Sequence, residues 1–451
     1  MQRSLFEFLK EWSGPTDPKP LLIRGARQVG KTHLVQEFAE FGKRTGKFET
    51  FVKINFEEEL KYQACFENLN PQEILNGLSF LSHEEIIPGK SLLFLDEIQA
   101  CPKALTALRY FREKMPKLHV IAAGSLLEFV LNHESISMPV GRVEYAYLYP
   151  CTFEEYLLAS QPKNFSMLKE FSLQNPPSAI AHEALLAEFK MFMITGGMPE
   201  VLKAYLPNKD LQKVIRVQNS ILQTYRDDFG KYASQTEYAC LQMLYDKAPG
   251  LVGTQITYSK VDPDRRSREL KNAIQLLEYA GLIKKIVATS ASGLPLATTA
   301  NEKKFKLQFL DVGLVQRASG LSSEFLLQEG LQKLNEGGLA EQVVGQLLLA
   351  HQDPLVAGSL YFWARNIRGS EAEVDFVMNF EGVIVPIEVK SGAKGRLKSL
   401  QLLLAEQKLP FGVKISTSPL SYEASILNVP FYLIGQLGSL VKDLLRFKFL
   451  N

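Results

Sequence analysis

The sequence lacks the cysteine and histidine spacings that build zinc sites and disulfide frameworks. Its four cysteines are scattered without a C-x-x-C pair, at Cys65, Cys101, Cys151 and Cys240. The six histidines form no H-x-x-x-H or H-E-x-x-H pattern. These absences argue against a zinc hydrolase and favour buried free thiols.

Long apolar runs and a strong net charge are also lacking. No uninterrupted apolar run reaches membrane-spanning length, and Glu7 stands where a signal peptide would be apolar. The formal net charge of +2 gives no overall attraction to nucleic acid, so such a site would need a local patch. We therefore expect a cytoplasmic protein without a membrane segment, and its 451 residues predict roughly three domains.

A short apolar run at residues 21–23 leads into the pattern G-x-x-x-x-G-K-[ST], which is typical of a phosphate-binding loop. The pattern is formed by Gly25, Ala26, Arg27, Gln28, Val29, Gly30, Lys31 and Thr32. The two glycines allow the backbone N–H groups to converge on phosphate oxygens, beside the positive end of the following helix. Lys31 would neutralise the β- and γ-phosphates, and Thr32 would bind Mg²⁺ through its hydroxyl.

A second apolar run, at residues 92–95, ends in Asp96 and Glu97. Such a run predicts a buried parallel strand, whose carboxyl end faces the crevice where α/β sheets bind ligands. Asp96 would hold the Mg²⁺ shell, and Glu97 would polarise the attacking water. Either motif alone would favour an ordinary strand or helix cap, but the two together, in this order, favour a nucleotide-hydrolysing site.

Three further segments extend this sheet. A strand is expected at residues 51–56, which lies in sequence between the loop strand and the Asp96 strand, and this order is similar to that of P-loop ATPases of the additional-strand type. The strand at 118–123 ends near Ser125, which would orient the water or sense the γ-phosphate, or else simply cap the next helix. Arg142 precedes a strand at 143–148 and would contact phosphate in cis, act as a finger in a neighbouring subunit of a homo-oligomer, or be an ordinary surface arginine.

The middle of the chain changes to a helical pattern. Residues 151–235 predict a helical lid over the nucleotide. Residues 236–325 predict three helices and a hairpin at 281–286 and 304–310, the elements of a winged helix-turn-helix. Between 255 and 310, ten basic and five acidic side chains give a local charge of +5. This charge favours DNA contact through phosphates, and the alternative is a protein-packing module with a solvated basic face.

The last region, 326–451, predicts a small α/β module with a helix at 338–347, three strands and a final helix from about Arg396. Asp375 lies in one strand, and Glu388 and Lys390 share a face of the next. Asp375 and Glu388, with Glu341 from the helix, would ligate Mg²⁺ or Mn²⁺, and Lys390 would position or activate the water that attacks a phosphodiester. The alternative is a buried ion pair in a fold that cuts nothing. The three elements resemble the PD-(D/E)xK nuclease superfamily.

Motifs along nearly the whole chain resemble a large prokaryotic family of AAA-like P-loop ATPases with a C-terminal domain of unknown function. They are residues 24–32, 94–99, 123–125, 141–142, 149–155, 196–200, 309–314, 373–376 and 387–390. The resemblance implies ATP binding and hydrolysis, a winged helix and a nuclease-like tail. One departure is Cys151, where similar proteins usually have an aliphatic residue.

The expected fold is therefore multidomain α/β. It has a parallel-sheet P-loop ATPase core at residues 1–150, a helical lid at 151–235, a winged helix at 236–325 and a restriction-endonuclease-like domain at 326–451. One functional hypothesis is a DNA-directed ATPase that controls a metal-dependent nuclease. The other is a nucleotide-dependent switch or scaffold whose tail is catalytically inactive.

Overall fold

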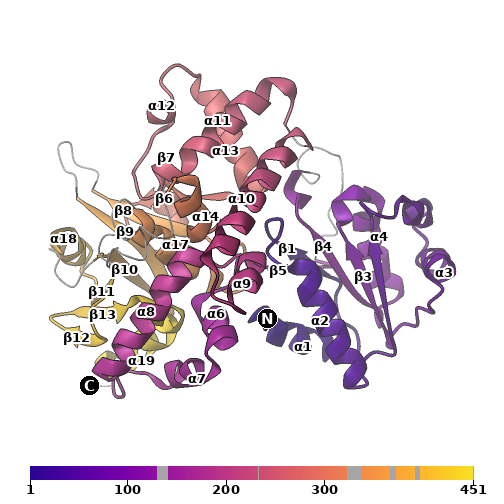
Figure 1. Ribbon diagram of the computed structural model, residues 1–451, viewed down its shortest axis with the longest axis horizontal. Helices are drawn as coiled ribbons and strands as arrows, with labels where there is room; N and C mark the ends of the chain where they lie inside the picture. The colour runs from indigo at the N-terminus through magenta and orange to yellow at the C-terminus, as the bar shows by residue number, and fades with distance from the viewer. Residues whose placement is uncertain (130–140, 232, 322–337, 366–371, 392–396, 450–451) are drawn as a thin grey trace. The chain divides into compact units, whose positions relative to one another are not determined.

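The computed structural model describes residues 1–129, 141–231, 233–321, 338–365, 372–391 and 397–449 (Figure 1). The chain forms two compact units. Unit 1 comprises residues 1–149, 279–281 and 353–357, and unit 2 comprises the remainder. None of the helices in the described ranges has the length and apolar character needed to cross a bilayer.

The core of unit 1 is a five-stranded parallel sheet. Its strands are β1 (Leu21–Arg24), β2 (Thr50–Asn55), β3 (Ser91–Asp96), β4 (His119–Gly124) and β5 (Glu144–Tyr147). They lie in the order β2-β3-β4-β1-β5. Strand β4 therefore separates the loop strand from the Asp96 strand, and the carboxyl ends of all five strands meet at one edge. Every residue of β3 and β4 is buried, which explains why both were recognisable as apolar runs.

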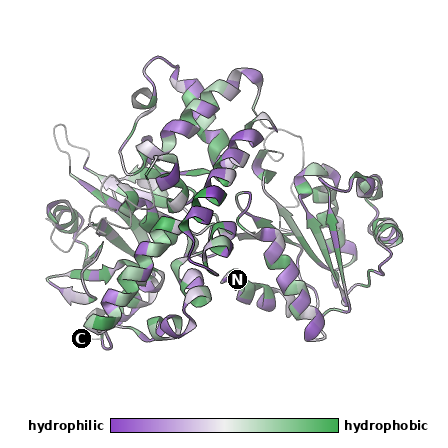
Figure 2. Ribbon diagram, in the orientation of Figure 1, coloured by the Kyte–Doolittle hydropathy of each residue, from purple (hydrophilic) through white to green (hydrophobic). Residues whose placement is uncertain are grey.

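Helices cover both faces of this sheet. The helices are α1 (Leu5–Ser13), α2 (Lys31–Arg44), α3 (Pro71–Ser82) and α4 (Pro102–Lys114). In Figure 1, α1 and α2 lie on one face, and α3 and α4 lie on the other. Alternate strand residues such as Leu93 and Leu95 join one apolar cluster with Ile74 and Leu108 of α3 and α4. Figure 2 shows the hydrophobic residues concentrated on the strands and on the helix sides that face them.

The first part of unit 2 is helical, in the region where the sequence predicts a lid. It contains α6 (Phe153–Ser160), α7 (Pro162–Glu170), α8 (Ala179–Thr195), α9 (Pro199–Tyr205) and α10 (Leu211–Asp228). Helix α6 begins with a capping box, in which Thr152 and Glu155 each bond the other's backbone N–H. The expected helices follow as α11 (Gln235–Leu251), the short α12 (Tyr258–Val261) and α13 (Ser267–Tyr279). Helix α14 (Val312–Ala318) comes after the hairpin.

The hairpin and the C-terminal strands form one eight-stranded mixed sheet. Its strands are β6 (Ile283–Thr289), β7 (Ala300–Phe309), β8 (Leu360–Ala364), β9 (Glu373–Phe380), β10 (Val383–Val389), β11 (Gly412–Ser416), β12 (Ser421–Glu423) and β13 (Ile426–Pro430). Their order is β12-β13-β11-β10-β9-β8-β6-β7, so β8 pairs with the free edge of β6. The remaining helices are α17 (Leu339–Ala350), α18 (Lys398–Gln407) and α19 (Leu437–Phe449).

This sheet differs from the arrangement expected from the sequence. The hairpin was expected in a winged helix of its own, whereas the structure joins it to the C-terminal strands through β6 and β8. Strands β11 to β13 and helix α19 add to the three strands and two helices that the sequence predicts. The expected boundary at 325/326 and the expected helix start at Arg396 lie outside the described residues.

Two motifs of the sequence, the turn at Gly196-Gly197 and the segment around Asp311, meet inside unit 2. Gly196, with φ of +71°, and Gly197 form the turn between α8 and α9. The backbone N–H of Gly197 donates to Asp311 Oδ2 at 2.6 Å, and Asp311 also caps α14 by accepting from the N–H of Leu314 at 3.2 Å. A Cβ on Gly196 would lie 2.0 Å from Asp311 Oδ1, so the turn requires glycine there. These motifs therefore hold the α8–α9 turn against α14.

Candidate functional site

The loop between β1 and α2 has the backbone that its glycines allow. Gly25 and Gly30 have φ of +152° and +94°. A Cβ on Gly25 would meet the carbonyl oxygen of Leu148 at 2.2 Å, because the loop passes directly against the backbone beyond β5. Gln28 also has a positive φ, of 64°. The loop therefore turns tightly at the start of α2, where backbone N–H groups are available to an anion.

Lys31 is buried beneath this loop. Its ammonium donates to the carbonyl oxygens of Gly25 and Ala26, both at 2.8 Å. Burial lowers the pKa of Lys31 to about 8, although Glu97 and Asp96 act in the opposite direction. Arg3, which the sequence analysis did not single out, supports the loop by donating to the carbonyl oxygen of Val29 at 2.8 Å.

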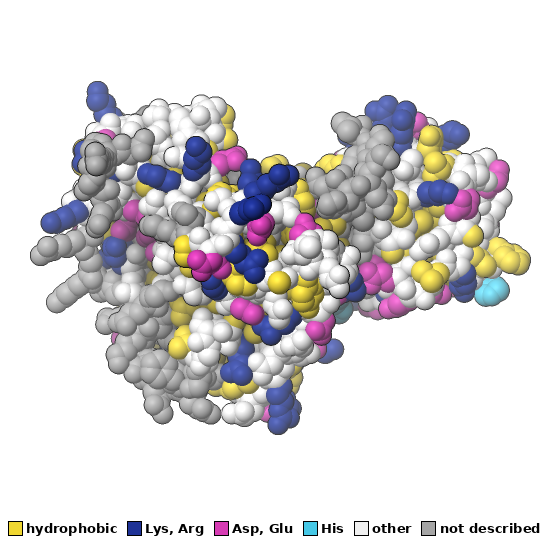
Figure 3. Space-filling view, turned by 90° about the horizontal axis from the view of Figure 1, so that it is seen from above, with side chains coloured by type: hydrophobic (Ala, Val, Ile, Leu, Met, Phe, Trp, Pro, Cys, Tyr) yellow, Lys and Arg dark blue, Asp and Glu magenta, His cyan; other side chains and the backbone are white. Residues whose placement is uncertain are grey.

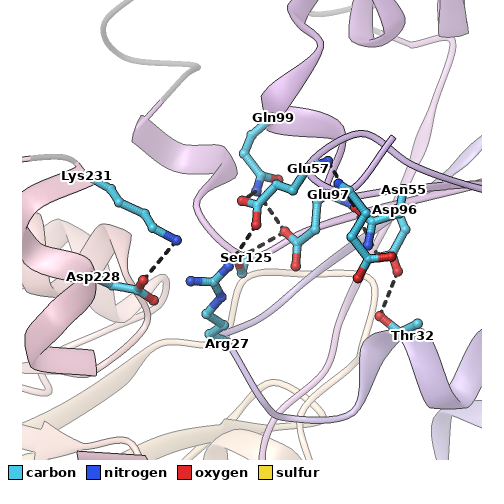
Figure 4. A network of polar contacts seen from close by, with 11 residues as sticks. Arg27, Thr32, Asn55, Glu57, Asp96, Glu97, Gln99, Ser125, Asp228 and Lys231 are labelled. Atoms are coloured by element: carbon cyan, nitrogen blue, oxygen red, sulfur yellow. Dashed lines mark hydrogen bonds and ion pairs between the residues drawn. The ribbon is translucent and has the colours of Figure 1, made fainter. Parts of the chain in front are cut away.

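Thr32 and Asp96 meet at the edge of the sheet. Thr32 lies in the first turn of α2 and Asp96 ends β3, and Thr32 Oγ1 donates to Asp96 Oδ2 at 2.9 Å (Figure 4). Burial raises the pKa of Asp96, and the bond from Thr32 opposes that shift. Lys53 Nζ lies 3.6 Å from Asp96 Oδ2. A hydroxyl and a carboxylate oxygen at this spacing fit the ligands that Mg²⁺ takes in phosphate-binding loops.

Glu97 lies beside this pair in a strained backbone conformation. Its φ is 48°, which is uncommon for a residue with a Cβ and is concentrated at functional sites. Its carboxylate accepts hydrogen bonds from Ser125 Oγ at 3.2 Å and from Gln99 Nε2 at 2.7 Å. The structure therefore brings Glu97 and Ser125 together, as the carboxyl ends of β3 and β4 require (Figure 4).

A chain of polar contacts continues beyond Glu97. Gln99 Nε2 also lies 3.4 Å from Glu57 Oε1, and Arg27 Nη2 donates to Glu57 Oε2 at 2.9 Å (Figure 4). Neither Glu57 nor Gln99 was predicted from the sequence to be a site residue. The signal that would have found Glu57 is its position just after β2, since the end of β2 lies next to the end of β3.

Arg142 does not lie with these residues. Strands β1 and β5 are parallel, so Arg142, which precedes β5, lies at the opposite edge from the loop that follows β1. Its Nε donates to Glu113 Oε1 at 3.1 Å, and its side chain is half exposed. The contact with phosphate in cis that the sequence allowed does not fit this placement. The direction of β5 decides at which edge of the sheet Arg142 lies, and the sequence motif alone does not give that direction.

The C-terminal candidate residues also come together, but around a lysine. Lys306 Nζ of β7 lies 2.8 Å from Glu341 Oε2, 2.5 Å from Glu373 Oε1 and 3.5 Å from Asp375 Oδ1. Asp375 Oδ2 accepts the backbone N–H of Val389 at 2.7 Å. Within the described part of the chain, no group of three or more His, Cys, Asp or Glu side chains is arranged to hold a metal ion. Two of the three expected ligands, Glu341 and Asp375, therefore contact Lys306, and the third, Glu388, pairs with Lys390.

Burial governs the charges of this cluster. It raises the pKa of Glu341 and of Glu388, and neighbouring Asp375 raises both further. Glu388 Oε1 is paired with Lys390 Nζ at 2.6 Å, and this partner raises the pKa of Lys390 against the effect of burial. Burial would lower the pKa of Lys306, but the surrounding carboxylates outweigh it and raise that pKa instead.

Comparison with protein families supports the assignment of unit 1. Residues 17–157 match a family model described as an AAA domain. Residues 186–324 and 336–432 match two models that are each described as a domain of unknown function. The first match covers β1 to β5, the phosphate loop and the Asp96-Glu97 pair. This part of the chain is therefore similar to AAA domains, in agreement with the P-loop core expected from the sequence.

Solved structures resemble the chain only distantly. The Walker-type ATPase of Pyrococcus abyssi is 16% identical with a TM-score of 0.43, and the match covers 70% of this chain and 94% of that one. The ORC1 protein of Aeropyrum pernix, solved with DNA, is 13% identical with a TM-score of 0.29 over 73% of this chain and 94% of that one. AMPPCP-bound DnaA of Aquifex aeolicus is 14% identical with a TM-score of 0.27 over 60% and 85%. A search of curated proteins gave no match.

Proposed function

We propose that this protein binds ATP with Mg²⁺ at the loop of residues 25–32 and hydrolyses it. The observation that carries the proposal is the 2.9 Å contact between Thr32 Oγ1 and Asp96 Oδ2 at the head of α2. Lys31 would leave its loop carbonyls to pair with the β- and γ-phosphates, and Thr32 and Asp96 would hold Mg²⁺. Bound Mg²⁺ neutralises charge on the phosphoryl group that is transferred.

Glu97 is the base in this proposal. Its carboxylate lies next to Asp96 and accepts a hydrogen bond from Ser125, so a water between Glu97 and Ser125 would face the γ-phosphate. Positioning and electrostatics supply most of the rate in phosphoryl transfer, and the protein needs no covalent intermediate.

Two variants test the site. We expect Lys31→Ala to lose ATP binding in a fluorescent-nucleotide titration, because the phosphate charge loses its partner. We expect Glu97→Gln to bind ATP as the wild type does and to lose about 10²-fold or more in kcat, the usual contribution of a general base. Unchanged turnover in Glu97→Gln would refute the assigned base, and unchanged ATP binding in Lys31→Ala would refute the site.

A second, DNA-associated function is favoured by the surface of α13 and the hairpin. Arg266, Arg268 and Lys271 are exposed on or just before α13, and Lys303 is exposed on β7. Figure 3 shows Lys and Arg side chains on the face that α11 to α13 occupy at the top of Figure 1. Lys306 was counted in the basic charge of this region but is buried, so the surface charge is smaller than the sequence suggested.

Salt-dependent binding to duplex DNA tests this function. Removing Arg266, Arg268 and Lys271 together should weaken binding and reduce the slope of log K against log salt by roughly 0.9 for each lost phosphate contact. A control that removes Lys43, Arg44 and Lys114, which are exposed in unit 1, changes the net charge equally and should leave the slope unchanged. Stimulation of ATP hydrolysis by DNA would favour a DNA-directed ATPase. If DNA neither binds nor stimulates ATP hydrolysis, while Lys31→Ala still abolishes ATP binding, the switch or scaffold hypothesis is favoured instead.

A further inference from the structure

Unit 2 contains a buried lysine that is surrounded by carboxylates. Lys306 is 1% exposed and lies on β7, in the middle of the eight-stranded sheet's longest strand. Its ammonium contacts Glu341 of α17 and both Glu373 and Asp375 of β9, which are far from it in sequence. One side chain therefore links the hairpin to the helix and strand that were expected to hold a metal.

A charge in this position must be compensated. An ammonium has three N–H donors and no acceptor, and the ammonium of Lys306 has three carboxylates within 3.5 Å. Without that cation, Glu341, Glu373 and Asp375 would place three like charges together in a largely buried space, which is strongly unfavourable. The lysine thus performs the electrostatic task that a divalent cation performs among such acids.

A fourth carboxylate of this region, that of Glu388, pairs with a different lysine. Glu388 is 6% exposed, and its Oε1 is taken by Lys390 at 2.6 Å. Its Oε2 is buried and, within the described residues, has no hydrogen-bond partner. Asp375 Oδ2 is taken by the N–H of Val389. The carboxylate oxygens of Glu341, Glu373 and Asp375 are of the kind that binds a divalent cation, and they contact the ammonium of Lys306 instead.

We propose that Lys306 is a built-in cation that takes the place of a divalent metal among Glu341, Glu373 and Asp375. The lysine holds β7 against α17 and β9 without any metal. In the wild-type protein the C-terminal region accordingly binds neither Mg²⁺ nor Mn²⁺ and cleaves no nucleic acid. This inference is independent of ATP hydrolysis, because it concerns a different unit and different residues.

Mn²⁺ binding to the full chain without nucleotide tests the proposal. The measurements use an Asp96→Asn background, which removes the cation site at the phosphate loop. The Asp96→Asn protein should bind no Mn²⁺ and show no change in Tm with Mn²⁺. Adding Lys306→Ala should lower Tm, create a site for one Mn²⁺ per chain in a titration followed by paramagnetic resonance, and make Tm rise on addition of Mn²⁺.

Further variants locate the new site and control for a general loss of charge. Adding Asp375→Asn to Lys306→Ala should abolish the Mn²⁺ response. Lys285→Ala removes a lysine from β6 that is partly exposed and pairs with Glu278 at 3.4 Å, so it should create no Mn²⁺ site. Lys306→Met combined with Glu341→Gln and Glu373→Gln removes the cation together with two of its three carboxylates, so it should fold without Mn²⁺ and bind none.

Three results would overturn the proposal. The first is binding of Mn²⁺ to the Asp96→Asn protein, in which Lys306 is intact, if that binding disappears when Asp375→Asn is added. It would show that the carboxylates bind a metal despite the lysine. The second is a Lys306→Ala protein with unchanged Tm and no Mn²⁺ site. The third is a Lys306→Ala protein that does not fold even in medium supplemented with Mn²⁺, together with an unfolded triple variant of Lys306→Met, Glu341→Gln and Glu373→Gln. Uncompensated carboxylates would then not be the cause of the loss of fold.

Discussion

At the scale of single residues, Glu97 is held by its neighbours more closely than its place in a motif implies. Its positive φ fixes the backbone, and Gln99 and Ser125 fix the carboxylate. The amide nitrogen of Gln99 faces two carboxylates, those of Glu97 and Glu57, so its orientation is determined by charge. Gln99 is therefore a positioning residue, which sets where the proposed base points and does not itself touch the nucleotide.

We expect Gln99→Ala to lower the kcat of ATP hydrolysis by roughly tenfold, which corresponds to about 1.4 kcal/mol, with little change in KM. The reason is that Glu97 loses a hydrogen bond at 2.7 Å but the phosphate loop is untouched. Gln63→Ala is a matched control, since Gln63 donates to the carbonyl oxygen of Ala100 nearby without contacting Glu97. The kcat and KM of ATP hydrolysis, measured for both variants by steady-state kinetics, test this role. A change in KM alone in Gln99→Ala would contradict it.

At the scale of elements, Asp311 joins the α8–α9 turn to α14 and α17. It is fully buried and accepts hydrogen bonds from Gly197, Leu314 and Gln346. No lysine or arginine is among these partners, so burial dominates and raises the pKa of Asp311 to about 6. The folded protein therefore holds a proton on Asp311 in a pH range where the unfolded chain releases it.

This shift predicts a pH dependence of stability with a definite sign. Because the folded-state pKa is the higher one, the contribution of Asp311 is fully present below about pH 4 and is lost as the pH rises through 6, with a total change of about 3 kcal/mol. We expect the difference in unfolding free energy between wild type and Asp311→Asn to move in favour of the variant by that order between pH 4 and 7. Urea unfolding across this range measures it, and a pH-independent difference would contradict the raised pKa.

The elements that were best predicted from the sequence are those whose structure is determined by a short run of neighbouring residues. The strand at 92–95 was recognisable because a strand buried on both faces is apolar at every position, and the loop of residues 25–32 because glycine is required by its backbone. The pairing of β6 with β8 was not predictable, since it joins segments about 70 residues apart without a local pattern. The burial of Lys306 was not predictable either. Its partners on α17 and β9 are distant in sequence, and they contact it only once the eight-stranded sheet has formed.

At the scale of the whole molecule, the position of Arg142 decides how it can take part in hydrolysis. It lies at the edge of the unit 1 sheet opposite the phosphate loop, and its partner Glu113 is exposed. An exposed ion pair of this kind contributes little to stability, so Arg142 is available to another molecule at small cost. Two roles predicted from the sequence remain: a finger that enters the site of a neighbouring subunit in a homo-oligomer, and an ordinary surface arginine.

Subunit mixing tests this role in trans. We expect Arg142→Ala to lower turnover by about 10³-fold, the lower end of what an arginine finger contributes, and to leave ATP binding intact. Wild-type turnover per chain should rise with protein concentration. Mixing Arg142→Ala with Lys31→Ala should restore turnover, because one partner supplies an intact phosphate loop and the other supplies the arginine. Arg109→Ala is the matched control, since Arg109 pairs with the same Glu113 oxygen at 3.1 Å and should leave turnover unchanged. If Arg142→Ala and Arg109→Ala are equally active, Arg142 is a surface arginine and the site is complete within one chain.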